Sequence, residues 1–274
     1  MDRWQQDDAL LRTLSPAGAV TSETHPQATS GWLPSGRAGA RFQVASPLAV
    51  RGAAYASARL PTLNELYRSF TVFPVTTLAN PALTPERLRG AEAGFELVAA
   101  RRLSLTATLF TSRLADAVAN VTVGTNLRQR RNVAAIVSRG AEIEGRWSFP
   151  HGSLAASWTG YRARVQSSDA LDGKRPAQTP DHAASATLTY SPATTVDVSG
   201  TVRRTGRAFE DDLNVDALPP ATTADAVVRW RFAPRLAVEL RAENIGNVRA
   251  LTRNQRGSID LGTPRTLWVA LSAR

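Results

Sequence analysis

The sequence predicts an all-β protein built as an antiparallel meander of about twelve strands. Apolar and polar residues alternate with a period of two, as in strands whose faces meet different surroundings. Short turns also alternate with long polar connections, as consecutive hairpins require. No stretch of about 18 uncharged apolar residues is present, which excludes a transmembrane helix but not a transmembrane barrel of alternating strands.

The strands follow one another along the chain with clear alternation in most of them. In one example, Leu103, Leu105 and Leu109 alternate with serine and threonine. The first strand alternates poorly, and Trp4 is its main apolar anchor. The predicted strands are 3–14, 37–45, 47–59, 87–98, 101–115, 134–149, 152–165, 182–191, 194–206, 222–232, 234–245 and 264–273.

The connections between these strands differ in length in a regular way. Tight turns rich in Pro, Gly and small residues are predicted near residues 46, 100, 151, 193 and 234. Long polar loops are predicted at 16–36, 60–86, 116–133, 166–181, 207–221 and 246–263. An outer-membrane barrel gathers its long loops at one end, whereas a soluble sandwich has no reason to do so.

The alternation also predicts the chemistry of the two sheet faces. The outer face is predicted to be apolar, with Leu103, Leu105, Trp147, Val198, Trp230, Val238 and Leu240. The concave face is predicted to be charged, with Glu142, Glu144, Arg146, Arg203, Arg229 and Arg241. Aromatic residues near the short turns, such as Phe149, Tyr190 and Phe232, suit a girdle at a lipid boundary. A solvated sheet surface would show the same charged pattern.

Composition and charge exclude several classes of protein. The net charge is +10, but Lys174 is the only lysine among 33 basic residues, and the arginines are scattered along the chain. This distribution argues against a nucleic-acid partner. The absence of cysteine excludes disulfides and thiolate metal sites.

No arrangement of residues predicts catalysis, a metal site or a cofactor. His25, His151 and His182 have no ligand spacing between them. Asp211 and Asp212 could meet a cation, although a solvated acidic loop explains them better. We therefore expect that the protein is not an enzyme.

Two motifs resemble the barrel of TonB-dependent outer-membrane receptors. They are Arg59-Leu60-Pro61-Thr62-Leu63-Asn64-Glu65-Leu66-Tyr67 and Asn80-Pro81-Ala82-Leu83-Thr84-Pro85-Glu86, which resemble the segments on either side of a long external loop in that family. Weaker resemblances follow in the family's order at 132–145, 179–182, 243–247 and 262–266.

The resemblance implies that residues 1–274 are the C-terminal half of the receptor barrel domain. A complete barrel of this family has roughly twenty-two strands around a plugged lumen. The plug domain, the TonB box and a signal peptide are not recognised in this sequence. We therefore expect an open sheet that does not close or transport alone, because its first strand lacks its partner and unpaired edges promote aggregation.

The resemblance further implies outer-membrane uptake of a scarce small-molecule ligand, such as an iron–siderophore or cobalamin. Outer-membrane lipid would surround the barrel, and the TonB system would act only through the plug. Aromatic and arginine side chains in the long loops suit aryl and anionic chelates. The candidate ligand contacts are Tyr67, Phe70, Phe73, Arg128, Arg130, Arg131 and Phe209. The alternatives are a soluble or surface-attached β-sheet binding module and a passive porin-like barrel.

Overall fold

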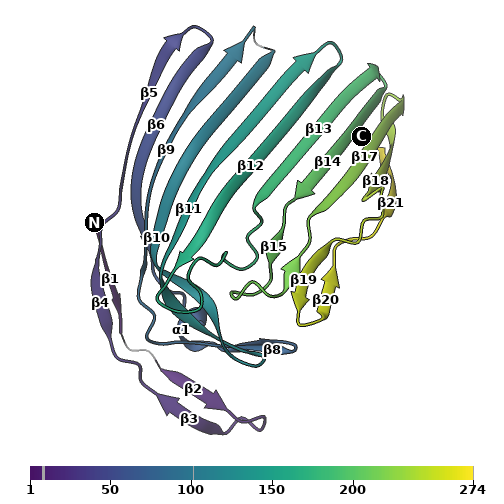
Figure 1. The fold of residues 1–274 in the computed structure, drawn as a ribbon. Coiled ribbons are helices and arrows are strands. Elements are labelled where there is room, and N and C mark those ends of the chain that lie inside the picture. The colour runs from purple at the N-terminus through teal and green to yellow at the C-terminus, as the bar shows by residue number, and fades with distance from the viewer. Residues whose placement is uncertain (8–9, 101, 274) are drawn as a thin grey trace.

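A single curved antiparallel sheet of 13 strands dominates the structure (Figure 1). The computed structural model describes residues 1–7, 10–100 and 102–273. The main path of the sheet, in chain order, comprises β5 (Gly36–Ala45), β6 (Leu48–Arg59), β9 (Glu86–Ala99), β10 (Leu103–Gly124), β11 (Leu127–Phe149), β12 (Gly152–Gln166), β13 (His182–Ala193), β14 (Val196–Thr205), β17 (Ala221–Ala233), β18 (Leu236–Glu243) and β21 (Thr266–Ala273). Each of these strands pairs with its neighbours in this order, which confirms the predicted meander.

The sheet is open in the part of the chain that the structure describes, because β5 and β21 form its two edges. The tight turns lie at one end of the sheet and the long connections at the other (Figure 1). The turn between β11 and β12 places His151 at a φ of 65°, a left-handed conformation typical of tight hairpins. This arrangement agrees with the alternation of short and long connections in the sequence.

The predicted first strand, 3–14, is wrong. Its residues instead form β1 (Asp2–Gln6) and β2 (Leu11–Leu14), and residues 8–9 lie outside the described part. β1 pairs with β4 (Thr29–Leu33), and β2 pairs with β3 (Val20–Thr24), away from the main sheet. The poor alternation of this segment is the physical reason, since a strand without an apolar face gains little from joining a two-faced sheet.

The predicted loop at 116–133 is also wrong, because β10 and β11 continue through it as a long hairpin. The hairpin turns at Asn126, whose φ is 55°. Four other connections contain short elements. The predicted loop at 16–36 contains β3 and β4, and the connection between β6 and β9 contains α1 (Leu63–Tyr67), β7 (Phe70–Val72) and β8 (Val75–Leu78). The connection after β14 contains β15 (Ala208–Phe209) and β16 (Ala217–Leu218), and the connection after β18 contains β19 (Leu251–Gln255) and β20 (Ser258–Leu261). Among the described residues, no helix is both long and apolar enough to cross a membrane.

Strand register places apolar side chains together on one face of the sheet, here called the apolar face. One row across seven strands contains Phe42, Val50, Phe95, Ala107, Ile143, Trp158 and Ala184. Among the residues that the structure describes, no protein layer covers this face: Trp147 and Trp230 are each 51% exposed and Leu240 is 50% exposed. Leu105 and Val238 are half-buried by their neighbours. The predicted apolar face is therefore confirmed.

The opposite face, here called the charged face, carries cross-strand ion pairs. Nε of Arg41 lies 2.9 Å from Oε2 of Glu96, and Arg51 lies 3.4 Å from both Glu92 and Glu96. Arg203 pairs with Asp225 on the same face. Because each such pair is partly exposed to solvent, the desolvation cost stays small, and the face suits a wet surface rather than a packed core.

The small apolar core of the protein lies where the long connections meet the sheet. It consists of Ala117, Val121, Val133, Val165 and Leu171. No large side chain is fully buried anywhere in the described residues. The sheet therefore depends on its strand ladders and its surroundings for stability more than on a protein interior.

Replacing Gly140 with alanine is expected to lower the unfolding free energy by about 1–3 kcal/mol, the usual range for overpacking. A Cβ at this position would lie 2.6 Å from the carbonyl oxygen of Gly160 and 2.7 Å from Cζ of Phe110. At Gly145 on the same strand, a Cβ would lie 3.7 Å from the nearest atom. Urea unfolding in detergent micelles compares the two variants, and equal stability would contradict this packing account.

Candidate functional site

The first of the two motifs, residues 59–67, contains a short capped helix at the start of the long connection between β6 and β9. The backbone N–H of Glu65 donates to Oγ1 of Thr62 over 3.2 Å, and the N–H of Thr62 donates to Oε2 of Glu65 over 2.7 Å. This reciprocal arrangement is a capping box, which satisfies two backbone donors that the helix leaves free. It fixes where α1 begins.

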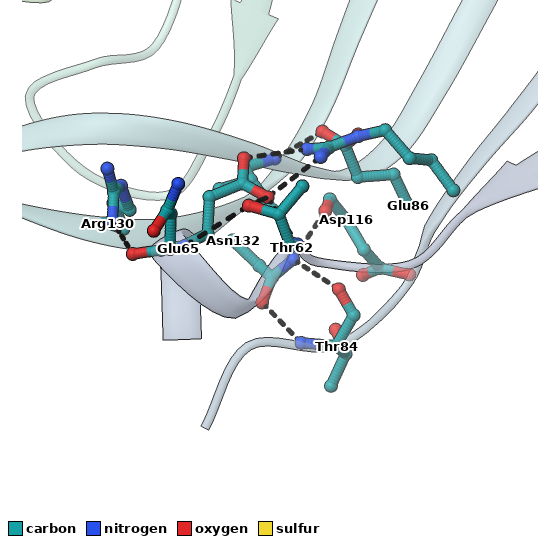
Figure 2. Close-up of polar contacts among 10 residues, drawn as sticks. Thr62, Glu65, Thr84, Glu86, Asp116, Arg130 and Asn132 are labelled. Atoms are coloured by element: carbon teal, nitrogen blue, oxygen red, sulfur yellow. Dashed lines mark hydrogen bonds and ion pairs between the residues drawn. The ribbon is translucent and has the colours of Figure 1, made fainter. Parts of the chain in front are cut away.

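Arg59, the last residue of β6, links this helix to the second motif. Its guanidinium donates to both carboxylate oxygens of Glu65, over 2.8 and 3.1 Å, and also pairs with Glu86. The side chain of Glu86 is 8% exposed, and its Oε1 accepts from the N–H of Val118 over 2.6 Å. Glu86 therefore joins β6, β9 and β10 at the base of the connection (Figure 2).

Asn132 on β11 holds the far end of the same connection. Its Nδ2 donates to the carbonyl of Thr84 over 3.0 Å, and its Oδ1 accepts from the N–H of Thr84 over 2.9 Å (Figure 2). Arg130 on the same strand donates to the carbonyls of Asn64 and Arg68. The two motifs thus fasten the connection against β10 and β11, and we refer to Arg59, Glu65, Glu86 and Asn132 as the latch.

The charge state of Glu65 is set by the latch. Partial burial raises the pKa of Glu65, but hydrogen bonds from Arg59 and from Thr62 outweigh it and lower the pKa from 4.5 to about 2. Since the folded pKa is depressed, the stabilisation is complete above about pH 4.5 and is lost as the pH falls toward 2.

We therefore expect protease cleavage within residues 60–85 to accelerate as the pH falls through this window. An acid-active protease, with its rate calibrated on an unstructured peptide, measures the effect. The variant Glu65→Gln should be cleaved rapidly at every pH in the window and should lose most of the pH dependence. The same steep pH profile in wild type and variant would show that Glu65 does not control the connection.

The fastened connection forms one wall of a cavity of about 490 Å³ at the long-connection end of the sheet. β7, β8, β10, β11 and β12 line it, together with residues from the connections that follow β12, β14 and β18. Its side chains combine apolar groups such as Phe70 with the basic groups of Arg128, Arg175 and Arg253. A site of this size and mixture suits a small organic ligand.

The acidic side chains of the cavity accept hydrogen bonds from other groups of the protein. Glu210 is 2% exposed, and its carboxylate accepts from Gln178 over 3.1 and 3.2 Å and from Gln255 over 3.2 Å. Asp212 accepts from the N–H of Thr122 over 2.8 Å. These donors are neutral, so both carboxylates keep their negative charge, and the cavity offers a ligand two buried acidic groups beside the guanidinium groups of Arg128, Arg175 and Arg253.

The structure places Phe70 and Arg128, among the predicted ligand contacts, in the wall of this cavity. Phe70 is 39% exposed, and the guanidinium of Arg130 lies 5.2 Å from its ring centroid. Within the described residues, Arg128 forms no ion pair with an acidic side chain. These two residues therefore combine an aromatic face with an available positive charge.

The other predicted contacts lie outside the cavity wall. Tyr67 accepts a hydrogen bond from Gln6, and Arg130 binds the backbone of α1. Arg131 donates to Gln129 over 2.9 Å. Phe73 is 81% exposed at the tip between β7 and β8, and the ring of Phe209 lies 5.0 Å from the guanidinium of Arg207.

The sequence analysis missed Arg175, Arg253 and Glu210 as cavity residues. Arg253 lies on β19, where it forms a two-point ion pair with Asp260 at 2.6 and 2.9 Å and also donates to the carbonyl of Phe73. No local pattern marks these residues, because only the folding of distant connections brings them to one place.

The remaining polar candidate, the pair Asp211 and Asp212, is held by hydrogen bonds within the protein. Asp211, like Asp212, is buried, and it accepts from the N–H groups of Val215 and Asp216 over 2.9 and 2.7 Å. Asp211 therefore shapes its own loop and Asp212 ties that loop to β10 through Thr122, so neither carboxylate forms a solvated acidic loop. Across residues 1–7, 10–100 and 102–273, no group of three or more His, Asp or Glu could hold a metal ion.

Comparison with known proteins agrees with this architecture. The family model described as TonB dependent receptor-like, beta-barrel matches residues 1–247. A search of curated protein sequences gave no match.

Solved structures share the fold. The ferric-catecholate import receptor Fiu of E. coli matches 95% of this chain with a TM-score of 0.74 and 22% identity. The ferric yersiniabactin uptake receptor FyuA of Yersinia pestis matches 93% with a TM-score of 0.72 and 16% identity. The siderophore receptor PiuA of Acinetobacter baumannii matches 94% with a TM-score of 0.73 and 16% identity.

This chain spans 38% of Fiu, 39% of FyuA and 38% of PiuA. At these identities the likeness shows the fold, while the family match extends over most of the sequence. On that match, the chain belongs to the TonB-dependent receptor-like β-barrel family.

Proposed function

We propose that this chain forms part of the wall and external mouth of an outer-membrane receptor that takes up a scarce metal chelate. The cavity lined by Phe70 and Arg128 carries the proposal, because it lies among the long connections at one end of the sheet. In a barrel of this kind, long connections face the outside. The apolar face would lie against lipid, and the charged face would line the interior.

An iron–siderophore of the catecholate type suits the cavity best. Ferric catecholates are anionic and expose aromatic rings, and Arg and Phe side chains recognise both features. The names of Fiu and FyuA concern ferric chelates, which supports the same class of ligand. Energy for transport would come from the TonB system, acting on a plug domain rather than on residues of this sheet.

Binding by the full chain, refolded in detergent micelles, tests the proposal. Equilibrium dialysis should show saturable binding of radiolabelled ferric tris-catecholate and weaker binding of metal-free catechol. Cyanocobalamin and a neutral oligosaccharide serve as competing ligand classes. Saturable binding of a competing class with none of the ferric complex would refute the choice of ligand. Steady ion conductance in planar bilayers without any ligand binding would favour a passive pore.

A further inference from the structure

The apolar face carries a second feature, a belt of arginines at its long-connection end. Strand register places Arg89 opposite Arg113, and Arg139 opposite Arg162. Arg164 lies opposite Val137, one pair further along. The belt therefore runs across β9, β10, β11 and β12, just beyond the apolar row that contains Trp158. Four residues of strand, about 13 Å, separate Trp158 from Arg162.

These arginines differ from those on the charged face in having no acidic partner. On the charged face, Arg41, Arg51 and Arg203 each pair with a carboxylate. In the described part of the chain, neither Arg139 nor Arg162 forms an ion pair or a side-chain hydrogen bond. A cluster of like charges without counter-ions is unfavourable alone and favours an anionic partner.

The belt also borders a cleft. Its volume is about 750 Å³, and Arg139, Arg162, Arg164 and Arg175 line it together with Trp158 and His182. Asp181 also lines it and pairs with Arg175, so Arg139, Arg162 and Arg164 carry the charge that no carboxylate balances. The ring of Trp158 lies over Gly160, since it would contact a Cβ added there, and so extends from the apolar row toward Arg162. The cleft thus offers positive charge at one end and an exposed indole ring at the other.

We propose that this cleft binds the phosphorylated headgroup of a lipid in the outer leaflet. Guanidinium groups match phosphate oxygens in two-point contacts, and three arginines converge here. The neighbouring apolar row would receive the acyl chains, and a tryptophan between the two regions suits the lipid–water boundary. A soluble anion would use only the charged end. The inference rests on the proposed membrane location but not on the chelate-binding cavity.

Lipid binding by the refolded chain in phosphatidylcholine nanodiscs tests the inference. The probe is fluorescent bis-phosphorylated lipid A, with inorganic phosphate as a competitor. The variant R139Q/R162Q/R164Q should bind about 100-fold more weakly, since each basic residue near a lipid surface contributes about a fivefold effect. The control R146Q/R249Q/R265Q removes equal charge at exposed positions outside the cleft and should bind as the wild type does.

The variant R139K/R162K/R164K retains the charge and should recover most of the affinity, which separates lipid recognition from misfolding. Equal weakening in both glutamine variants would overturn the inference, as would displacement of lipid A by inorganic phosphate at equal concentration. Ferric tris-catecholate binding by R139Q/R162Q/R164Q should be unchanged. If the wild type binds the ferric complex but not lipid A, this inference alone is refuted. If the wild type binds lipid A but not the ferric complex, the proposed function alone is refuted.

Discussion

The variant Glu86→Ala is expected to be about 2–3 kcal/mol less stable than the wild type, the range for losing hydrogen bonds to a charged group and leaving a buried donor unpaired. The side chain of Glu86 is 8% exposed, and its carboxylate pairs with Arg59 and accepts a hydrogen bond from the N–H of Val118. Removing it leaves a guanidinium and a backbone donor without this partner, at the point where three strands meet. Urea unfolding of the detergent-solubilised chain, followed by tryptophan fluorescence, measures the loss.

Glu23→Ala provides the matched control for this experiment. Glu23 also pairs with an arginine, Arg12, but its side chain is 40% exposed on the separate β2–β3 hairpin. An exposed pair of this kind contributes at most about 1 kcal/mol. Similar losses in the two variants would show that the latch is an ordinary surface contact. A much larger loss for Glu86→Ala supports its structural role.

The variant Arg128→Glu is expected to weaken binding of ferric tris-catecholate by about 10- to 100-fold. Arg128 lines the cavity without an acidic partner in the described residues, so charge reversal places a carboxylate directly against an anionic ligand. Arg131→Glu is the control, because Arg131 lies on the same strand, outside the cavity wall, and contacts Gln129. Equal weakening in both variants would indicate a general charge effect instead of a site.

The main strands could be predicted because each strand of the central sheet has two unlike faces. Alternation of Leu103, Leu105 and Leu109 with polar residues reflects that physical difference directly. The N-terminal strands β1 to β4 pair in small separate ladders without two such faces. The hairpin extension of β10 and β11 was missed because residues such as Arg128 and Arg130 gave it the polarity of a loop. The two strands of the extension pair with each other, and β11 also pairs with β8.

The candidate site could be predicted only in part, for a related reason. Phe70 and Arg128 were predicted as ligand contacts from residue type alone, and both lie in the cavity wall, although their contact with a ligand stays a prediction. The latch was visible as a motif, but the pairing of Arg59 with both Glu65 and Glu86 required the fold. Arg253 reaches the carbonyl of Phe73 across 180 positions of sequence, and no local signal encodes such a contact.

The central claim is that one face of the sheet lies against lipid and the other against water. Single-tryptophan variants of the chain, retaining only Trp230 or only Trp268, test it in liposomes. Trp230 is on the apolar face, whereas Trp268 lies on the charged face, where its Nε1 donates to Oε2 of Glu243 over 3.3 Å. Brominated acyl chains should quench Trp230 and spare Trp268, and aqueous acrylamide should do the reverse. Equal quenching of both residues by each reagent would contradict the account.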